Sequence, residues 1–486
     1  MYLGIDIGTS GVKAVIVDDA GAVLTDGHAT LSVNRPKPLH SEQNPSDWWE
    51  ATNSAVMALE PKWRKAVTAV GLTGQMHGAT LIGDDGKALR PAILWNDGRS
   101  AVECETLERS VQDLRAITGN CAMPGFTAPK LLWVKNHEPD IFSKIRKVLL
   151  PKDYVRLRMT GDYASDMSDS AGTLWLDTEN RRWSDAVLNA TGLTTDHMPR
   201  LYEGTEVTGR LRAELAEAWG MARVDVVAGG GDNAAGAVGS GVVEKGEGFL
   251  SLGTSGVIFL ADDAYRPHPD GGIHTFCHAL PNRWHQMAVM LSAASAIDWV
   301  AGICGFDDPA ALYATAETSN RLSRGEIFLP YLSGERTPHN NPSAQGVFFG
   351  LTHATGTAEL AQAALEGVAF GLADGVKALR DSGAEIKSLS VIGGGSKSAY
   401  WGKILASVFD IPLIYRDSGS VGPAYGAARL ARLGVTKVCI EDVCKPPAIQ
   451  NIIEPDAAMR DHLMERLGLF RSLYASLSEA FKENQS

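Results

Sequence analysis

The sequence predicts an α/β protein made of two copies of one unit that face each other across a central cleft. The hexapeptide IGTSGV at residues 7–12 returns as LGTSGV at 252–257, near the start of the second half of the 486-residue chain. A chain of this length also exceeds the usual size of one hydrophobic core, so two domains are expected. The alternative is that GTSG is a favourable hairpin turn used twice by chance.

Composition and charge narrow the classes of partner. The chain is 44% hydrophobic and 21% charged, as in ordinary globular proteins, and its net charge of −12 argues against a nucleic-acid or anionic-membrane partner. The six cysteines form no C-x-x-C pair, which disfavours a zinc module and a disulfide framework. Without a signal-peptide pattern or a long apolar run, the sequence predicts a cytoplasmic protein. It leaves the oligomeric state open, with a homodimer as one alternative.

The first half opens with three strands. YLGIDIG and VKAVIV are strand-like segments joined by TSG, and DDAG then turns the chain into AVLTDGHATL, which predicts an antiparallel meander. A helix follows, with Asn44 as its N-cap, Pro45 at its first position and Asp47 in its first turn. The segment AVTAVGLTG then predicts another strand.

The second half repeats this order. GFLSLGTSGVIFL again predicts strand, turn and strand, and a long helix from about Thr357 to Asp381 precedes the strand SLSVIGG. The Gly-rich and charged stretch GSGVVEKGEG, at 239–248, predicts the boundary. We therefore expect domains at 1–243 and 244–486.

The two GTSG turns are candidate phosphate sites. Each offers backbone N–H groups and two hydroxyls without bulky side chains, so one turn from each domain could hold a polyphosphate. Asp6 directly precedes the first turn, where a carboxylate could hold Mg²⁺, and its counterpart in the second copy is Ser251. A local hydrogen bond is the alternative role for Asp6. The candidate phosphate-binding residues are Thr9, Ser10, Gly253, Thr254 and Ser255.

A third Gly-rich stretch, VDVVAGGGDNAAGAVG at 224–239, predicts a buried strand, a turn and a helix that starts near Asp232. It also matches G-x-G-x-x-A through Gly229, Gly231 and Ala234, so a dinucleotide site is an alternative. The acidic residue that such a site needs at a strand end is missing. Asp232 is then either a helix N-cap or a cleft carboxylate stabilised by the helix N-terminus.

A fourth Gly-rich stretch is SLSVIGGGSKSAYWGKILA at 388–406. Gly393, Gly394 and Gly395 would let a ligand approach the backbone, and the following helix N-terminus favours anions. An ordinary strand-to-helix turn is the alternative. The chain has no G-x-x-x-x-G-K-[ST] motif, which excludes a P-loop kinase.

Polar and amphipathic side chains follow two apolar strands, in GLTGQMHGATL and ILWNDGR. Ligands of α/β proteins bind at such strand ends, and the residues there are Gln75, Met76, His77, Trp95, Asn96, Asp97 and Arg99. The segment HTFCH spaces His274 and His278 as a metal pair on a helix would be spaced. Its flanks are strand-like, so we interpret both histidines, and Cys277, as structural.

These motifs together resemble the FGGY carbohydrate kinases, in the superfamily of sugar kinases, actin and heat-shock ATPases. GFTAPKLLW at 125–133 and GVFFGLTHATGTAELAQAALE at 346–366 are similar to the two signatures of that family. The segments GIDIGTSG, GQMHGATL, LWNDGR, PYLSGERTPH and VIGGGSKS are most similar to its members that phosphorylate D-xylulose. The resemblance implies two duplicated actin-like, or ribonuclease H-like, domains.

The resemblance also implies the reaction, which is ATP-dependent phosphorylation of D-xylulose at its 5-hydroxyl. Asp232 would be the general base, Asp6 would support Mg²⁺ and catalysis, and Met76, His77 and Asn233 would contact the sugar. The second GTSG turn would hold the phosphates of ATP, and the Gly393 turn would approach the adenosine and the α-phosphate. The alternatives are a kinase for another sugar or polyol, an actin-like or chaperone-like ATPase, and an NAD-dependent dehydrogenase.

Overall fold

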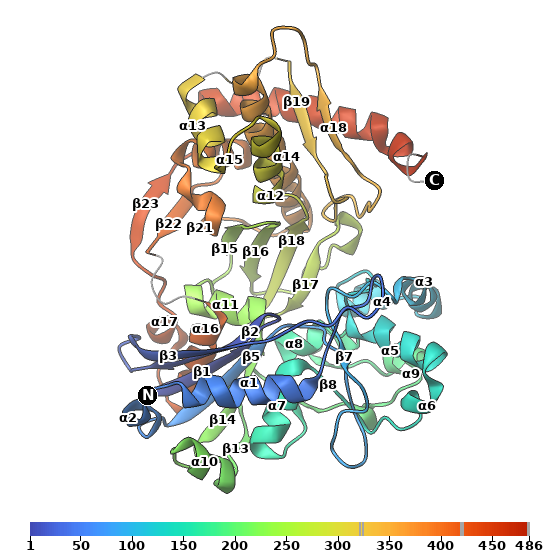
Figure 1. Cartoon of the computed structure of the whole chain (residues 1–486), viewed down its shortest axis with the longest axis vertical. Helices are drawn as coiled ribbons and strands as arrows, with labels where there is room; N and C mark the ends of the chain where they lie inside the picture. Colours follow the sequence, from blue (N-terminus) through green and yellow to red (C-terminus); the bar gives the residue numbers. More distant parts are fainter. Residues whose placement is uncertain (320–321, 323–324, 418–421, 484–486) are drawn as a thin grey trace.

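The computed structural model describes residues 1–319, 322, 325–417 and 422–483, and two large sheets organise it (Figure 1). The sheet of the first half has six strands in the order β13-β14-β5-β1-β2-β3. Strands β1, β2 and β3 form the expected antiparallel meander, and β1, β5 and β14 are parallel. The bounds are β1 Tyr2–Ile7, β2 Gly11–Val17, β3 Val23–Thr30, β5 Ala69–Gly74, β13 Val207–Arg210 and β14 Asp225–Gly231.

The sheet of the second half repeats this arrangement. Its order is β17-β18-β16-β15-β21-β22-β23, in which β15, β16 and β18 are antiparallel and β15, β21 and β22 are parallel. The duplicated unit is therefore confirmed. The bounds are β15 Glu247–Leu252, β16 Gly256–Asp262, β17 His274–Cys277, β18 Trp284–Met290, β21 Ser388–Ile392, β22 Leu413–Arg416 and β23 Ile449–Ile453.

Two helices were predicted closely from local sequence. Helix α1 (Pro45–Met57) begins after Asn44, whose side-chain oxygen accepts the Ser46 N–H at 3.2 Å. Helix α14 (Thr357–Asp381) has the expected bounds, and its first turn is closed by Glu359, which accepts the Gly356 N–H at 2.9 Å. Helix α14 packs on β18 and β19 (Ile327–Pro330), at the centre of the core of the second half.

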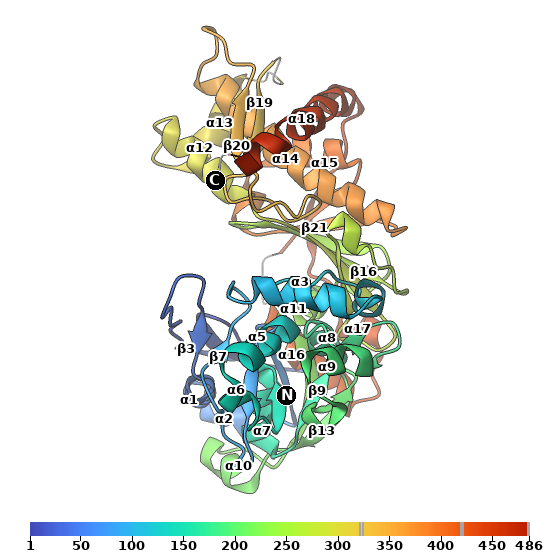
Figure 2. The ribbon, with the colours of Figure 1, turned by 90° about the vertical axis from the view of Figure 1, so that its right-hand side faces the viewer.

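A lobe inserted between β5 and β14 supplies further elements of the site. An apolar cluster joins this lobe to the second sheet, through Trp175 and Leu176 on one side and Phe259 and Phe276 on the other. Figure 2 shows the lobe beneath β16 in the side view. Its elements include β6 Thr80–Ile82, β7 Ala92–Ile93, α3 Ala101–Ser110, α4 Leu114–Thr118, α5 Thr127–His137, α6 Pro139–Phe142, β8 Lys147–Leu149, α7 Pro151–Thr160, β9 Ala164–Asp166, α8 Met167–Ala171, β10 Leu176–Asp177, β11 Arg182–Trp183, α9 Asp185–Thr191 and β12 Arg200–Tyr202.

Helix α16 (Pro423–Val435) belongs to the second half of the sequence, yet it covers the first sheet. It lies directly on β1 and on α11 (Asp232–Ser240), because glycines remove the side chains between them. A Cβ on Gly4 would overlap the main-chain oxygen of Ala424, and one on Gly426 would overlap that of Ala235. The two halves are thus interlocked, and the division at residues 243 and 244 stays a prediction.

The remaining helices and strands complete the two layers. They are β4 Glu42–Gln43, α2 Pro61–Arg64, α10 Ala213–Trp219, α12 Ala294–Ile303, α13 Pro309–Ser319, β20 Gly346–Phe349, α15 Ala399–Phe409, α17 Ile440–Val443 and α18 Ala457–Glu483, with 3-10 turns at Thr195–His197, Pro269–Gly271 and Gly394–Lys397. The segment after Gly434, which matched no motif, forms the edge strand β23 and the long helix α18. Among the described residues, no helix is both long and apolar enough to cross a membrane.

Candidate functional site

The predicted residues of the first half meet at the carboxyl ends of three adjacent parallel strands. Ile7 of β1, Gly74 of β5 and Gly231 of β14 lie in register across the sheet. The first GTSG turn, the Gln75 to His77 segment and Asp232 each follow one of these strand ends. The register therefore brings three motifs that are distant in sequence to one edge, as is usual for ligand sites of parallel sheets.

Asp232 is the first residue of α11, and Gly231 takes the N-cap position. Its Oδ1 accepts the backbone N–H of Asn233 at 2.7 Å and the Asn233 side-chain amide at 3.0 Å. Burial raises the pKa of the Asp232 carboxyl to about 6, against the hydrogen bonds from Asn233, which lower it. Asp232 is thus a stronger base than an exposed aspartate, and it is still ionised at neutral pH.

Asp6, near the end of β1, is the second carboxylate of the site. Burial and the neighbouring Asp232 charge raise its pKa to about 7, and Lys13, its partner in register on β2, lowers it. Its buried Oδ1 has no hydrogen-bond partner among the described residues, and Asp6 and Lys13 line a cavity of about 210 Å³. An orphaned carboxylate oxygen beside a second carboxylate fits Mg²⁺, which commonly takes one or two protein carboxylates, substrate phosphates and waters.

Met76 and His77 leave β5 toward Asp232. His77 adopts a left-handed backbone conformation (φ 68°), and its Nδ1 lies 2.5 Å from the main-chain oxygen of Gly172. Burial and then the Lys130 charge lower the His77 pKa to about 3, so the ring is neutral. Met76 is only 4% exposed and packs against Gly231, where a Cβ would approach the Met76 sulfur to 3.0 Å.

The two hydroxyls of the first GTSG turn have different surroundings. The Thr9 hydroxyl donates to Gln75 Oε1 at 2.9 Å and accepts the indole N–H of Trp95 at 3.0 Å. Gln43 completes this chain by donating to the Thr9 carbonyl at 2.7 Å. Ser10 is exposed, and its hydroxyl makes no hydrogen bond within the described part of the chain. Thr9 thus joins the turn to the segment that follows β5, through Gln75, a contact that the motif alone did not reveal.

The second half presents the corresponding turns at the end of its own parallel strands. The turn Gly253, Thr254 and Ser255 follows β15, and its main-chain oxygens accept hydrogen bonds from the start of α12. The Gly393 turn follows β21. The turn requires a glycine at residue 393, because Gly393 has a φ of 95° and a Cβ there would lie 2.7 Å from the Leu252 main-chain oxygen. Among the described residues, nothing lies within 4 Å of a Cβ placed on Gly394.

The side chains of the candidates Asp97, Arg99 and His274 bond to neighbouring protein groups. Arg99 binds the Asp97 carboxylate through two nitrogens, at 2.9 and 2.7 Å, in a buried pair. His274 and Cys277 lie on strand β17 rather than on a helix, and the His274 ring bonds the Asn120 side chain at 2.9 Å. In the described part of the chain, no group of three or more His, Cys, Asp or Glu side chains could hold a metal.

Arg336 is a site residue that motif reasoning did not single out. It belongs to the second half, in the loop between β19 and β20, yet its positive charge lowers the pKa values of His77 and His274. Its guanidinium makes no hydrogen bond to another described residue. The second half therefore places a cation near His77 and His274 of the site. The only sequence signal was its place in PYLSGERTPH.

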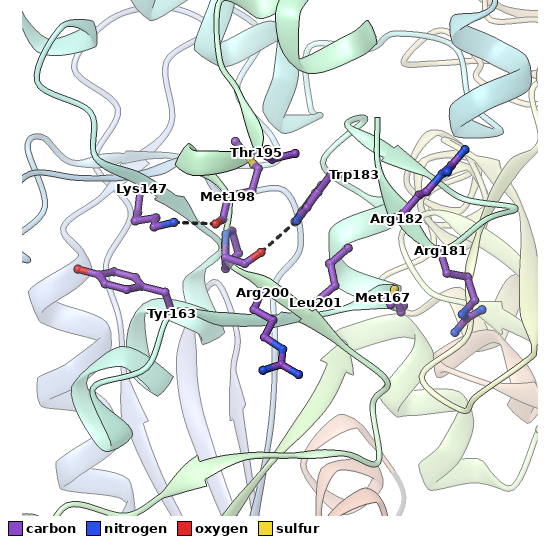
Figure 3. A pocket seen from close by; sticks show the side chains of 11 residues that line it. Lys147, Tyr163, Met167, Arg181, Arg182, Trp183, Thr195, Met198, Arg200 and Leu201 are labelled. Atoms are coloured by element: carbon purple, nitrogen blue, oxygen red, sulfur yellow. Dashed lines mark hydrogen bonds between the residues drawn. The ribbon is translucent and has the colours of Figure 1, made fainter. Parts of the chain in front are cut away.

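A hollow of about 710 Å³ lies apart from these strand ends, in the inserted lobe (Figure 3). It is lined by basic and aromatic side chains, but most of its cations are engaged. Lys147 donates to two main-chain oxygens at 2.7 and 2.9 Å, Arg181 pairs with Glu203 at 2.7 Å, and Arg182 pairs with Asp177 at 3.3 Å. None of the predicted site residues lines it.

Family models match both halves of the chain. Residues 1–239 match the N-terminal domain, and residues 248–434 the C-terminal domain, of the FGGY family of carbohydrate kinases. The chain belongs to this FGGY family. It therefore has the two-domain, actin-like fold of sugar kinases, as the sequence predicted.

The FGGY relatives include proteins similar over their full length. The xylulose kinase of Escherichia coli strain K12 is 54% identical over 98% of this chain and 99% of its own, and that of Klebsiella pneumoniae is 51% identical with the same coverage. The crystal structure of a xyloylose kinase from Brucella ovis has a TM-score of 0.95 at 49% identity and covers 99% of both chains. A gluconate kinase from Lactobacillus acidophilus reaches a TM-score of 0.92 at 23% identity, with 99% of both chains covered, so shape alone separates no substrates within the family.

Proposed function

We propose that this FGGY kinase transfers the γ-phosphoryl group of ATP to D-xylulose and gives D-xylulose 5-phosphate. The observation that carries this conclusion is the 54% identity to a xylulose kinase along almost the whole chain. The site agrees with it, because a partly buried carboxylate with a raised pKa, a neutral imidazole and an amide lie at one sheet edge. This set suits a small polyhydroxylated substrate.

The sugar is held by groups with unused hydrogen-bonding atoms. Because the neutral His77 ring donates its Nδ1 hydrogen to Gly172, its Nε2 is an acceptor for a sugar hydroxyl. The amide nitrogen of Asn233 donates to Asp232, which leaves the Asn233 oxygen for a second hydroxyl. Met76 supplies an apolar wall against the carbon chain.

Asp232 acts as the general base. Its pKa of about 6 leaves it ionised at neutral pH, so it can accept the proton of the 5-hydroxyl as that oxygen attacks phosphorus. The phosphoryl transition state is loose, so a weak base suffices and positioning supplies most of the acceleration. The proton moves from the 5-hydroxyl oxygen to Asp232, and a bond forms between that oxygen and the γ-phosphorus. The bond between the γ-phosphorus and the bridging β-phosphate oxygen breaks, and ADP leaves.

The phosphates lie between the two halves in this proposal. The hydroxyls of Thr254 and Ser255 make no hydrogen bonds among the described residues, so these hydroxyls and the backbone N–H groups of the two residues can bind phosphate oxygens. Asp6 would hold Mg²⁺, and the ion when bound would neutralise part of the phosphate charge. The Gly393 to Gly395 turn admits the adenosine and the α-phosphate, and Ser10 contacts the phosphates from the first half.

The test is a sugar panel for purified enzyme, with ADP release as the readout. We expect no more than slow ATP turnover without sugar, and the highest kcat/KM with D-xylulose among D-xylulose, L-ribulose, glycerol and gluconate. A higher kcat/KM for one of the other three would assign a different sugar to the same site. Turnover that is independent of any sugar would instead favour an actin-like or chaperone-like ATPase.

A further inference from the structure

Helix α8 reaches both the base and the sugar segment of the site. It is a single short helix in the inserted lobe, Met167–Ala171, preceded by Asp166 and ended by Gly172. Ser168, near its start, accepts the backbone N–H of Gly231 at 3.1 Å, and Gly231 directly precedes Asp232. Gly172, at its end, accepts the His77 ring hydrogen at 2.5 Å.

The packing around α8 leaves little space for movement. A Cβ on Gly172 would lie 2.7 Å from both the His77 ring and the Met76 methyl group. A Cβ on Gly230 would lie 3.0 Å from the Ser168 hydroxyl oxygen. The helix therefore contacts the loop before the base and the sugar-binding pair at the same time.

A buried ion cluster holds the start of α8 through Asp166 and Asp169. The ammonium of Lys152, in the first turn of α7, lies 2.6 Å from Asp153, 2.6 Å from Asp166 and 3.1 Å from Asp169. Lys152 is 0% exposed, and burial opposes its charge, yet the three carboxylates raise its pKa above the ordinary value. Burying such a cluster is unfavourable unless each charge is paired.

Asp166 connects this cluster to Ser168, which in turn bonds the residue before Asp232. One oxygen of Asp166 lies 2.6 Å from the Lys152 ammonium, and the other accepts the Ser168 and Asp169 N–H groups at 2.9 and 3.1 Å. The same oxygen accepts the Ser168 hydroxyl at 2.6 Å. Because the hydroxyl hydrogen points to Asp166, a lone pair of Ser168 remains for the Gly231 N–H.

We propose that Lys152 and α8 form a positioning unit that aligns Asp232 with the sugar bound at His77. Phosphoryl transfer depends on the placement of the attacking hydroxyl, and small misplacements of the base reduce the rate strongly. Neither Lys152 nor Ser168 touches the substrate in this assignment. Both act through Gly231 and Gly172, and the assignment rests on the proposed kinase function.

The test compares two buried serines that each accept a backbone N–H group. Ser168→Ala removes the acceptor of the Gly231 N–H. Ser407→Ala is the matched control, because the buried Ser407 hydroxyl accepts the Asp456 N–H at 3.0 Å on α15, outside the proposed site. We expect Ser168→Ala to lower kcat by about tenfold to a hundredfold with the KM for ATP unchanged, and Ser407→Ala to keep kcat within about twofold at a similar melting temperature. Equal kcat in the two variants would overturn the proposal.

A second comparison separates positioning from general structural damage. If Ser168 acts through Asp232, then adding Ser168→Ala to an Asp232→Asn enzyme lowers kcat no further. Additive losses would overturn the proposal. Should Ser168→Ala not fold, Ser168→Cys, whose thiol is a weak acceptor, takes its place in both comparisons. All variants are assayed with the sugar that the wild-type enzyme phosphorylates best. A wrong assignment of D-xylulose would therefore not change how the kcat values of the variants are interpreted.

Discussion

The Nδ1 atom of His77 lies 2.5 Å from the main-chain oxygen of Gly172, which fixes the tautomer of a ring in the proposed sugar site. A main-chain oxygen only accepts, so Nδ1 carries the hydrogen, and the neutral ring offers Nε2 as an acceptor. His77→Ala should therefore raise the KM for the sugar by about threefold to tenfold, the range for one neutral hydrogen bond. Calorimetry should find ATP affinity unchanged. An equal loss of ATP affinity would place His77 in the nucleotide site.

Local sequence predicted the repeated parts of this fold well. The hairpins around the two GTSG turns, the Asn44 cap of α1 and the bounds of α14 all follow from patterns within a few residues. The position of α16 on the first sheet could not be predicted this way. In that contact Gly426 lies against Ala235, and Gly4 lies against Ala424. The residues around a glycine in the sequence do not indicate which distant part of the backbone it will approach.

The candidate site was only partly predictable for the same reason. Asp232 and His77 follow strand ends, and strand ends are visible in sequence. The roles of Ser168 and Lys152 depend on hydrogen bonds across 63 residues and on an ion cluster that only the fold assembles. Arg336 approaches the sugar residues from the other half of the chain, which spacing in the sequence does not indicate.

Thr9 and Ser10 should differ although both belong to the same turn. Thr9→Val leaves the Trp95 N–H and Gln75 without their hydroxyl partner, so it should destabilise the protein by about 1–3 kcal/mol and lower kcat/KM for the sugar. Ser10→Ala removes an exposed hydroxyl and should change stability by less than about 0.5 kcal/mol, with its effect confined to the KM for ATP. Thermal unfolding and steady-state kinetics check both. Matching unfolding curves for the two variants would contradict the hydrogen-bond chain.

Asp6 and its counterpart Ser251 should respond unequally to substitution. Asp6→Asn keeps the shape of the side chain but removes the charge proposed to hold Mg²⁺, so activity should fall and half-maximal activity should need more Mg²⁺. Stability should not fall, because burial and the nearby Asp232 already disfavour the charged form. Ser251→Ala should change activity far less. A comparable loss in both variants, measured across a Mg²⁺ titration, would refute this asymmetry.

The pH dependence follows from the pKa of Asp232. A base with a pKa of about 6 is protonated below that value, so kcat should rise by about tenfold per pH unit up to roughly pH 6 and then level off. The pKa of Asp232 is raised from 3.8 to about 6 on folding, so the contribution of this group to the free energy of unfolding declines as the pH rises between these two values. A rise in activity over the same pH range therefore cannot come from an effect of Asp232 on stability, because that effect has the opposite sign. A flat profile between pH 5 and 7 would argue against a base with this pKa.

Asp232→Asn isolates the proton acceptor of the reaction. Asn keeps the size of the side chain and an oxygen that accepts the Asn233 N–H now held at 2.7 Å, so the start of α11 should be preserved. Sugar and ATP should still bind, because neither depends on the charge of the base. Removing a general base should lower kcat by about 10²–10⁴. The melting temperature should stay the same or rise slightly, since a buried carboxylate with a raised pKa is replaced by a neutral amide.

The structural alternative for Asp232 makes the opposite forecast. If the residue only supports the start of α11, Asn replaces it with near-normal activity, because the two side chains serve about equally well at a helix start. The two accounts therefore differ by at least about a hundredfold in kcat at equal stability. Steady-state kinetics and thermal unfolding of one purified variant decide between them. An Asp232→Asn enzyme that keeps more than about a tenth of the wild-type kcat would exclude the catalytic role, since no general base of the usual strength contributes so little.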